Sequence, residues 1–208
     1  MHVQRKPLTI FDLDSAEERV GTSLSNPFEA SLALHLHRSL ARETYHMSTK
    51  SCVAVITPYA QQAALLRRIF SQENNVEVHT VDSFQGKESD IIIFSAVRAS
   101  GSRGVGFLSD VRRMNVALTR AKHFLFIIAR CDSIIVNPYW KDLVNNAREA
   151  NAVIRVPVTG RNHNNFIKLC NMKPVRPLTK KIPSISKKRK ADSGLSKIDE
   201  SDEVGEIR

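Results

Sequence analysis

The sequence predicts an α/β fold with a mostly parallel sheet and helices on both of its faces. Continuous apolar segments of strand length occur at 52–57, 90–95 and 124–128, as expected of strands that are buried on both faces. Segments with helical periodicity lie between them. Strands that alternate with helices in this way are typical of covered parallel sheets, in which ligands bind beyond the carboxyl ends of the strands.

The expected elements follow one another along the chain. A short strand at 8–11 precedes a helix that begins at Pro27, because proline suits the first helical position, and that runs to about Met47. The remaining expected elements are a strand at 52–57, a helix from Pro58, strands at 76–78 and 90–95, a helix at 111–122, a strand at 124–128, a helix at 140–150 and a strand at 152–156. The connections at 57–59, 80–88 and 95–98 are therefore expected near strand ends.

The helix expected at 111–122 carries two arginines on one side. Its apolar stripe consists of Val111, Met114, Leu118 and Ala121. Ser109 or Asp110 is expected to cap its first turn. Arg113 and Arg120 lie two turns apart, so they are expected to project together. On spacing alone, a solvated basic face is the commoner outcome, and a pair of phosphate-binding arginines is the alternative.

The composition favours an anionic partner. The chain has 31 Lys and Arg against 21 Asp and Glu, a net charge of +10, which points to nucleic acid before a membrane surface. No apolar run approaches the roughly 18 residues of a membrane span, so no membrane partner is predicted. The three cysteines are far apart and form neither a CxxC pair nor a Cys/His ladder, so no metal site is predicted.

The segment at 80–88 is rich in groups that can bind a ligand. Thr80 and Ser83 offer hydroxyls, Gln85 an amide and Glu88 a carboxylate, while Gly86 allows close approach of the backbone. It is not a Walker A loop, which requires a glycine five residues before the Gly-Lys pair and a Ser or Thr after it. A polar turn before a buried strand is an equally open interpretation.

Three ordered segments resemble motifs IV, V and VI of the superfamily 1 helicases, in the group that contains senataxin and the nonsense-mediated-decay helicase. They lie at 56–62, 80–88 and 106–122, and the run at 137–144 resembles the senataxin-type end of the same domain. The resemblance spans about residues 8–157. It implies a RecA-like domain that packs beside a first domain, with ATP between them and single-stranded nucleic acid across the top.

The resemblance implies a role for each matching residue. Arg120 matches the arginine finger that reaches the γ-phosphate, and Arg113 matches the other phosphate-facing arginine. Such a finger contributes on the order of 10³–10⁵ in rate. Nucleotide contacts are implied for Gln85, Gly86 and Glu88. Contacts to the nucleic-acid backbone are implied for Thr57, Pro58, Tyr59, Thr80 and Ser83, whereas the role of Gln62 is left open.

Two regions are expected along the chain. Residues 1–173 are predicted to be the second RecA-like helicase domain, without the domain that carries the Walker A and B motifs. Residues 174–208, in which prolines mix with lysines, serines and then acidic residues, are predicted to be a disordered tail. Within the tail, Lys187, Lys188, Arg189 and Lys190 resemble a nuclear import signal. A solvated basic linker is the alternative there.

The resulting hypothesis is the C-terminal motor half of an ATP-dependent RNA or DNA helicase. In the family, the first domain supplies the P-loop, and the second begins with a Tyr-Arg motif that these 208 residues do not contain. ATP with Mg²⁺ is therefore expected only if a first RecA-like domain, or another helicase subunit, is supplied. Single-stranded RNA or DNA is the expected partner and the nucleus the expected location. The alternatives are an inactive nucleic-acid-binding or regulatory module, or a truncated fragment of a longer helicase.

Overall fold

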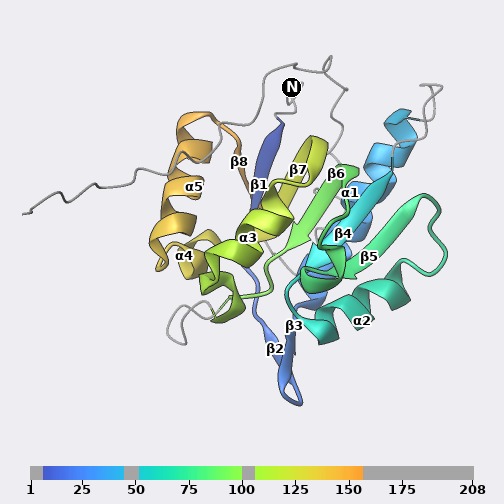
Figure 1. Cartoon of the computed structure of the whole chain (residues 1–208), viewed down its shortest axis with the longest axis horizontal. Coiled ribbons are helices and arrows are strands. Elements are labelled where there is room, and N and C mark those ends of the chain that lie inside the picture. Colours follow the sequence, from blue (N-terminus) through green and yellow to red (C-terminus); the bar gives the residue numbers. More distant parts are fainter. Residues whose placement is uncertain (1–6, 45–51, 100–105, 157–208) are drawn as a thin grey trace, which may run out of the picture. The chain divides into compact units, whose positions relative to one another are not determined.

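A six-stranded sheet runs through the centre of the computed structural model, which describes residues 7–44, 52–99 and 106–156 (Figure 1). The strands are β1 (Leu8–Leu13), β4 (Val53–Thr57), β5 (Val76–Thr80), β6 (Ser89–Ser95), β7 (Ala121–Ala129) and β8 (Val153–Val156). Their order is β5-β4-β6-β7-β1-β8, and every pairing is parallel. The prediction of a mostly parallel α/β sheet is confirmed.

Helices cover both faces of this sheet. Helices α1 (Pro27–Thr44) and α2 (Ala60–Ile69) lie on one face, and α3 (Val111–Leu118), α4 (Cys131–Ile134) and α5 (Pro138–Glu149) lie on the other (Figure 1). Because successive strand residues point to opposite faces, β4 serves two cores. Val53 and Val55 belong to the core beneath α1 and α2, whereas Ala54 and Ile56 belong to the core beneath α3 and α5. This double burial explains why the strands are apolar throughout.

The prediction for the 111–122 helix was wrong at its carboxyl end. Helix α3 stops at Leu118, and Ala121 already belongs to β7. The Thr119 hydroxyl donates to the Asn115 carbonyl at the helix end, and Ala121 then pairs with Ser89 of β6. Sheet pairing therefore ends the helix early, and Arg120 lies in the connection rather than on the helix face that Arg113 occupies.

The structure also differs from the sequence-based prediction in where α2 begins and in several short elements. Helix α2 begins at Ala60 rather than Pro58, because Tyr59 is still extended at φ −112°. The hairpin of β2 (Glu18–Val20) and β3 (Ser23–Ser25) was not predicted, since its strands have only three residues each. The 3-10 turns η1 (Asp82–Phe84) and η3 (Gly106–Ser109) were also missed, as was α4.

Some predictions fall outside the described residues. The expected end of the first helix near Met47, the tail at 174–208 and the basic run at 187–190 belong to this group. Among the described helices, none combines the length and the apolar character that crossing a membrane requires.

Candidate functional site

Helix α3 begins at a capped turn that fixes the direction of its arginines. The Asp110 side chain accepts hydrogen bonds from the backbone N–H groups of Arg112 (2.9 Å) and Arg113 (3.4 Å). The Ser109 hydroxyl instead donates to the Gly106 carbonyl. Of the two predicted caps, Asp110 is therefore the one that satisfies the first turn, as is usual for an N-cap aspartate.

The Arg113 side chain lies between two carboxylates and an aromatic ring. Its Nε is 3.2 Å from Asp82 Oδ1 and 3.8 Å from Asp110 Oδ2. Its guanidinium carbon lies 5.1 Å from the centroid of the Phe107 ring, a cation–π contact. The side chain is 37% exposed, so it is held by these groups and still open to a ligand.

Arg120 lies beside Glu88 because the strands that follow them are paired. Ser89 and Ala121 are register partners in β6 and β7, and the Ser89 N–H donates to the Arg120 carbonyl. Arg120 Nη1 is 4.0 Å from Glu88 Oε1, and the arginine side chain is 37% exposed. Its buried Nε has no hydrogen-bond partner within the part of the chain that the structure describes. An oxyanion ligand could reach the exposed part of this side chain but not the enclosed Nε atom.

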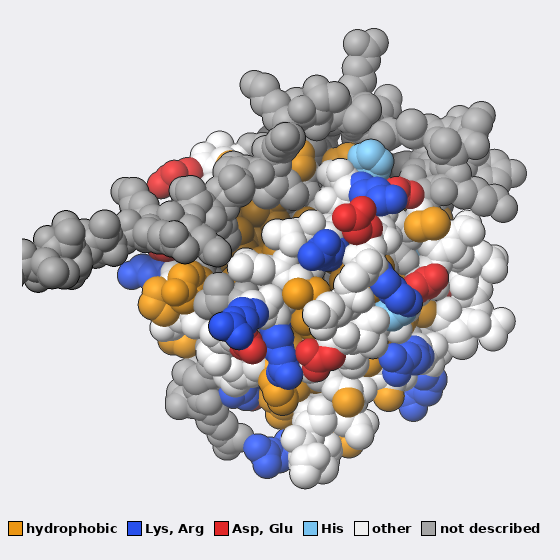
Figure 2. All heavy atoms as spheres, in the orientation of Figure 1, with side chains coloured by type: hydrophobic (Ala, Val, Ile, Leu, Met, Phe, Trp, Pro, Cys, Tyr) orange, Lys and Arg blue, Asp and Glu red, His pale blue; other side chains and the backbone are white. Residues whose placement is uncertain are grey.

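The segment from η1 to the start of β6 brings Asp82 and Glu88 to the arginines. Gln85, Gly86 and Glu88 are all exposed there. Gly86 has φ +81°, and a Cβ at this position would meet nothing within 4 Å, so its backbone conformation rather than close packing requires glycine. We call the following residues the arginine surface: Asp82, Glu88, Phe107, Arg113 and Arg120. Figure 2 shows basic side chains interspersed with acidic ones on the face that carries α3.

Thr80 and Ser83 form a closed turn at the carboxyl end of β5. The Thr80 N–H donates to Ser83 Oγ at 3.0 Å, and the Ser83 N–H donates to Thr80 Oγ1 at 3.2 Å. The Ser83 side chain is exposed and that of Thr80 is partly exposed. The Thr80 hydroxyl also donates to Ser83 Oγ, and the Ser83 hydroxyl donates to the Thr80 carbonyl. The turn therefore places two hydroxyls, both hydrogen-bonded within it, at the edge where the sequence predicted a ligand.

The predicted motif IV residues divide into exposed and buried positions. Pro58 is partly exposed, and Thr57 pairs in register with Thr80 of β5. Thr57 and Tyr59, however, are 0% and 4% exposed. The Tyr59 N–H lies 3.4 Å from Thr57 Oγ1 and donates to it. The structure thus brings Pro58, Thr80 and Ser83 to one open edge and gives Thr57 and Tyr59 internal contacts.

Gln62 belongs to a group of buried polar side chains from the start of α1, from α2 and from the end of β6, which we call the buried polar network: Asn26, Glu29, Gln62 and Ser95. Gln62 Oε1 accepts from the Asn26 N–H at 2.8 Å, and Gln62 Nε2 donates to the Asn26 carbonyl and to Ser95 Oγ. The Ser95 hydroxyl donates to Glu29 Oε2 at 2.6 Å. The open role of Gln62 is therefore structural, since it ties α2 to the start of α1 and the end of β6.

Glu29 is the ionisable member of this network and is 0% exposed. Burial raises its pKa to about 8, although hydrogen bonds from Ser95 and from the backbone of Val97 oppose the shift. Its carboxyl group is therefore mainly protonated at neutral pH. No local pattern in the sequence distinguishes this glutamate from a surface residue in the first turn of a helix.

The buried polar network holds a strained connection that leaves β6. Val97 has φ +70°, an unusual conformation for a β-branched residue. Its N–H donates to Glu29 at 2.9 Å. Beyond it, Arg98 Nη1 donates to Glu17 at 3.0 Å, and the Ala99 N–H donates to the same carboxylate at 2.7 Å. Strain of this kind persists only where surrounding contacts determine the backbone.

Two members of the arginine surface had no predicted role. Asp82 and Phe107 lie inside the segments that resemble motifs V and VI, so their position was the available signal. Among the described residues, no group of three or more His, Cys, Asp or Glu side chains is arranged to hold a metal ion.

Comparison with known proteins gives matches over most of the chain. A family model described as an AAA domain matches residues 1–132. The chain is 39% identical over 157 residues to a Dictyostelium discoideum protein named as a probable helicase, covering 74% of this chain and 16% of that protein. It is 32% identical over 176 residues to the Mus musculus protein named "Probable helicase senataxin", covering 82% of this chain and 7% of that protein.

A third relative is the ATP-dependent helicase NAM7 of Saccharomyces cerevisiae. The identity is 36% over 169 residues, covering 77% of this chain and 16% of the relative. The chain therefore spans between 7% and 16% of the length of these three curated relatives.

Proposed function

Because this chain belongs to the superfamily 1 helicases related to senataxin and to the regulators of nonsense transcripts, we propose that it forms the second RecA-like motor domain of such a helicase. One observation carries the proposal. The segments that match motifs V and VI meet in space, where Asp82 faces Arg113 and Glu88 faces Arg120. Ion pairs between the two segments hold both arginines on an exposed surface.

The arginine surface is proposed to bind the phosphate groups of a nucleotide held by a first domain. ATP would supply the phosphoryl bond that is cleaved, and Mg²⁺ would come with it. Arg113 and Arg120 would neutralise phosphate charge through the exposed parts of their side chains. Gln85, Gly86 and Glu88 would line the approach to these arginines. A correctly placed arginine contributes on the order of 10³–10⁵ in rate.

The open edge formed by Pro58, Thr80 and Ser83 is proposed to contact the backbone of single-stranded RNA or DNA. Hydroxyl groups bind phosphate oxygens without reading sequence, and here they would exchange hydrogen bonds within the turn for bonds to phosphate. Thr57 and Tyr59 are proposed to act here by shaping the edge from inside, in keeping with their burial. The net charge of +10 supports an attraction to nucleic acid that weakens as salt is added.

Binding of a fluorescent single-stranded oligouridylate to the 208-residue chain tests this edge. We expect weak binding at 50 mM salt that falls steeply by 200 mM, as for other phosphate-dominated contacts. Ser83→Glu is expected to weaken it by placing a negative charge at the edge. Ser71→Glu is the matched control, since Ser71 is exposed and follows α2, at the other end of β5. Undetectable binding at low salt, or equal losses in both variants, would contradict the proposed contact.

ATP turnover distinguishes the motor domain from a complete enzyme. The 208-residue chain contains no Walker A motif, so we expect no ATPase activity from it in isolation. Turnover by the purified chain that disappears in Arg120→Ala would overturn this part of the proposal. Binding without turnover is also what an inactive regulatory module would show, and stimulation by an added first RecA-like domain would favour the motor.

We also propose that Lys187, Lys188, Arg189 and Lys190 direct import into the nucleus. The four basic residues are consecutive in the sequence. A fluorescent fusion in which all four are alanine is expected to lose nuclear enrichment. Replacing Arg67 and Arg68, which are exposed near the end of α2, controls for the general loss of positive charge.

A further inference from the structure

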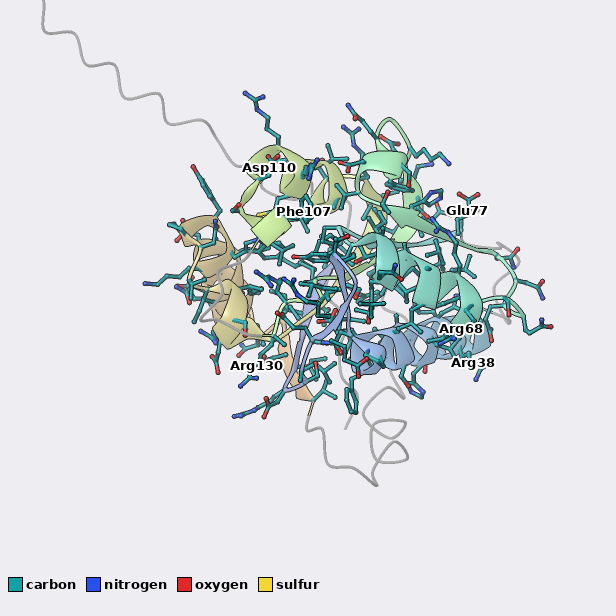
Figure 3. All side chains as sticks on the ribbon, turned by 90° about the horizontal axis from the view of Figure 1, so that it is seen from below. Arg38, Arg68, Glu77, Phe107, Asp110 and Arg130 are labelled. Atoms are coloured by element: carbon teal, nitrogen blue, oxygen red, sulfur yellow. The ribbon has the colours of Figure 1, made fainter. Side chains whose placement is uncertain are left out.

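Phe107 has a defined place between a buried tyrosine and an exposed arginine. It belongs to η3, directly before the capped start of α3, and is 51% exposed. Figure 3 shows Phe107 and Asp110 together at this junction, whereas Arg38 and Arg68 lie with α1 and α2. The exposure of a single aromatic residue is common and means little by itself. The contacts of the ring with Tyr59 and with Arg113 are what distinguish Phe107.

Tyr59 supports the ring from the protein side. The two ring centroids are 5.6 Å apart at an interplanar angle of 76°, an edge-to-face arrangement that aromatic pairs favour. Tyr59 is 4% exposed, so it is a fixed support rather than a second mobile side chain. Phe107 is therefore held in place although half of its surface is open.

The backbone before Phe107 is packed against the same tyrosine. Gly106 has φ +53°, and a Cβ at this position would lie 3.1 Å from the Tyr59 hydroxyl oxygen and 3.3 Å from Arg98 Nη2. These distances are tighter than ordinary van der Waals contacts. The turn that presents Phe107 thus has little freedom to shift towards the core.

Arg113 lies over the Phe107 ring. Its guanidinium carbon is 5.1 Å from the Phe107 centroid, while its Nε faces Asp82 at 3.2 Å. Ion pairs between exposed groups alone restrain a long side chain weakly, because solvent screens them. A planar ring adds a surface over which a guanidinium group rests in a preferred place.

We propose that Phe107 is a positioning residue for Arg113. Its ring, held edge-on by Tyr59, keeps the guanidinium group in place and thereby prepares Arg113 to receive a phosphate oxyanion. This role rests on the proposed function of the arginine surface, whereas the contact between the ring and the guanidinium group does not. The same contacts join the end of β4, through Tyr59, to the phosphate-facing side of α3.

Nuclear magnetic resonance of the 208-residue chain tests the proposal with two readouts. The first is the ring-current shift of the Arg113 side-chain protons, assigned with an Arg113→Lys variant. The second is the change that sodium tripolyphosphate produces at the Arg113 and Arg120 Nε–H signals. The variants are Phe107→Leu, Phe107→Trp and, as matched control, Tyr139→Leu. Tyr139 is 52% exposed and lies at the start of α5.

In Phe107→Leu, the Arg113 shifts are expected to move towards those of a solvated arginine. The affinity for tripolyphosphate seen at Arg113 should fall by about two- to five-fold, the size of a cation–π contact at an exposed site. The Arg120 pair with Glu88 should be unaffected. Phe107→Trp should keep both Arg113 signatures, because tryptophan is the strongest cation–π partner. Tyr139→Leu should change neither.

The outcomes separate this inference from the proposed function. Unchanged Arg113 shifts or an unchanged tripolyphosphate affinity in Phe107→Leu would overturn the positioning role. An equal loss in Tyr139→Leu, or a phosphate response at Arg120 but not at Arg113 in the unmodified chain, would overturn it as well. A chain in which tripolyphosphate perturbs neither arginine, while the ring-current shift persists, contradicts the proposed phosphate site itself.

Discussion

The arginine surface and the buried polar network are both polar assemblies drawn from distant segments, but they are built in opposite ways. In the arginine surface, the pairs of Asp82 with Arg113 and of Glu88 with Arg120 have separations of 3.2 and 4.0 Å between half-exposed side chains. In the buried polar network, Glu29 and Ser95 are both 0% exposed, and the distance from Ser95 Oγ to Glu29 Oε2 is 2.6 Å. The arginine surface therefore has long ion pairs that are open to solvent, whereas the buried polar network has a short hydrogen bond that is closed to solvent.

The difference shows how the domain separates ligand binding from structural support. The charged pairs of the arginine surface stay where water screens them, so they contribute little to folding and remain free to meet a ligand. Inside the protein, the only carboxyl group of the buried polar network has a pKa of about 8 and is mainly protonated at neutral pH. A neutral group that accepts hydrogen bonds avoids the large cost of an isolated buried charge.

The largest effect is expected from Glu29→Ala. It removes the acceptor for the Ser95 hydroxyl and the Val97 N–H, and it leaves a cavity. With a cost of about 1–3 kcal/mol for each unsatisfied buried group, urea denaturation should show a loss of about 4 kcal/mol. Glu77→Ala is the control, since its side chain is 71% exposed. A loss below about 1 kcal/mol would mean that the Ser95 hydroxyl and the Val97 N–H find other hydrogen-bond partners in the variant.

The second effect is a pH dependence of stability. The folded pKa of Glu29 is about 8 against an ordinary value of 4.5, so between these values the native state retains a proton that the unfolded state has lost. Raising the pH therefore destabilises the protein, by about 3 kcal/mol between pH 5.5 and 8. This contribution is fully present below pH 4.5 and is lost as the pH rises through 8.

Glu29→Gln should remove this dependence, because an amide does not ionise. The free energy of unfolding of both proteins should be measured across the same pH range. Burial lowers the pKa of His37, which acts in the opposite direction, and the difference between the two proteins cancels its contribution. Parallel pH profiles for the two proteins would show that Glu29 does not titrate within this range.

A smaller effect is expected at the boundary of the arginine surface. Gly106→Ala and Gly21→Ala both place a side chain at positive φ, at +53° and +61°, at a cost of about 1–2 kcal/mol for the backbone. Only the Cβ at residue 106 also approaches Tyr59 and Arg98. Thermal and urea denaturation should therefore show a greater loss for Gly106→Ala. Equal losses would indicate that the turn before Phe107 relaxes easily.

The smallest change in stability is expected within the arginine surface itself. Arg120→Ala removes a half-exposed pair with a separation of 4.0 Å, so the free energy of unfolding should change by less than about 1 kcal/mol. Binding of tripolyphosphate should nevertheless fall sharply. Arg68→Ala, at an exposed position near the end of α2, should affect neither. A marked destabilisation by Arg120→Ala would remove the contrast between the two regions.

Several elements could be predicted because their signals are local. Apolar runs identified β4 and β6, since both faces of these strands are buried. Pro27 and Asp110 marked helix starts through their own backbone and hydrogen-bonding properties. The end of α3 has no local signal in the sequence, because the pairing of Ala121 with Ser89 of β6 determines where the helix stops. Arg120 was consequently predicted on a helix and lies beyond one.

The candidate site shows the same limit. The resemblance implied contacts to the nucleotide for residues of 80–88 and of 106–122, and the structure shows the two segments in contact through Asp82 and Arg113. The sequence did not reveal that Thr57 and Tyr59 are buried, because burial depends on what the neighbouring elements cover. It also carried no sign of the ring of Phe107 beneath Arg113.

Apolar periodicity, capping residues and motif spacing are properties of short segments. The amino-acid sequence was therefore enough to predict the six strands of the main sheet, the principal helices, the order of the motifs and the family. Which polar residues are buried and which stay exposed depends on the tertiary structure. Asn26, Glu29 and Gln62 look in the sequence like ordinary helix residues. Their hydrogen bonds and the raised pKa of Glu29 arise only when folding removes water and brings α1, α2 and the end of β6 together.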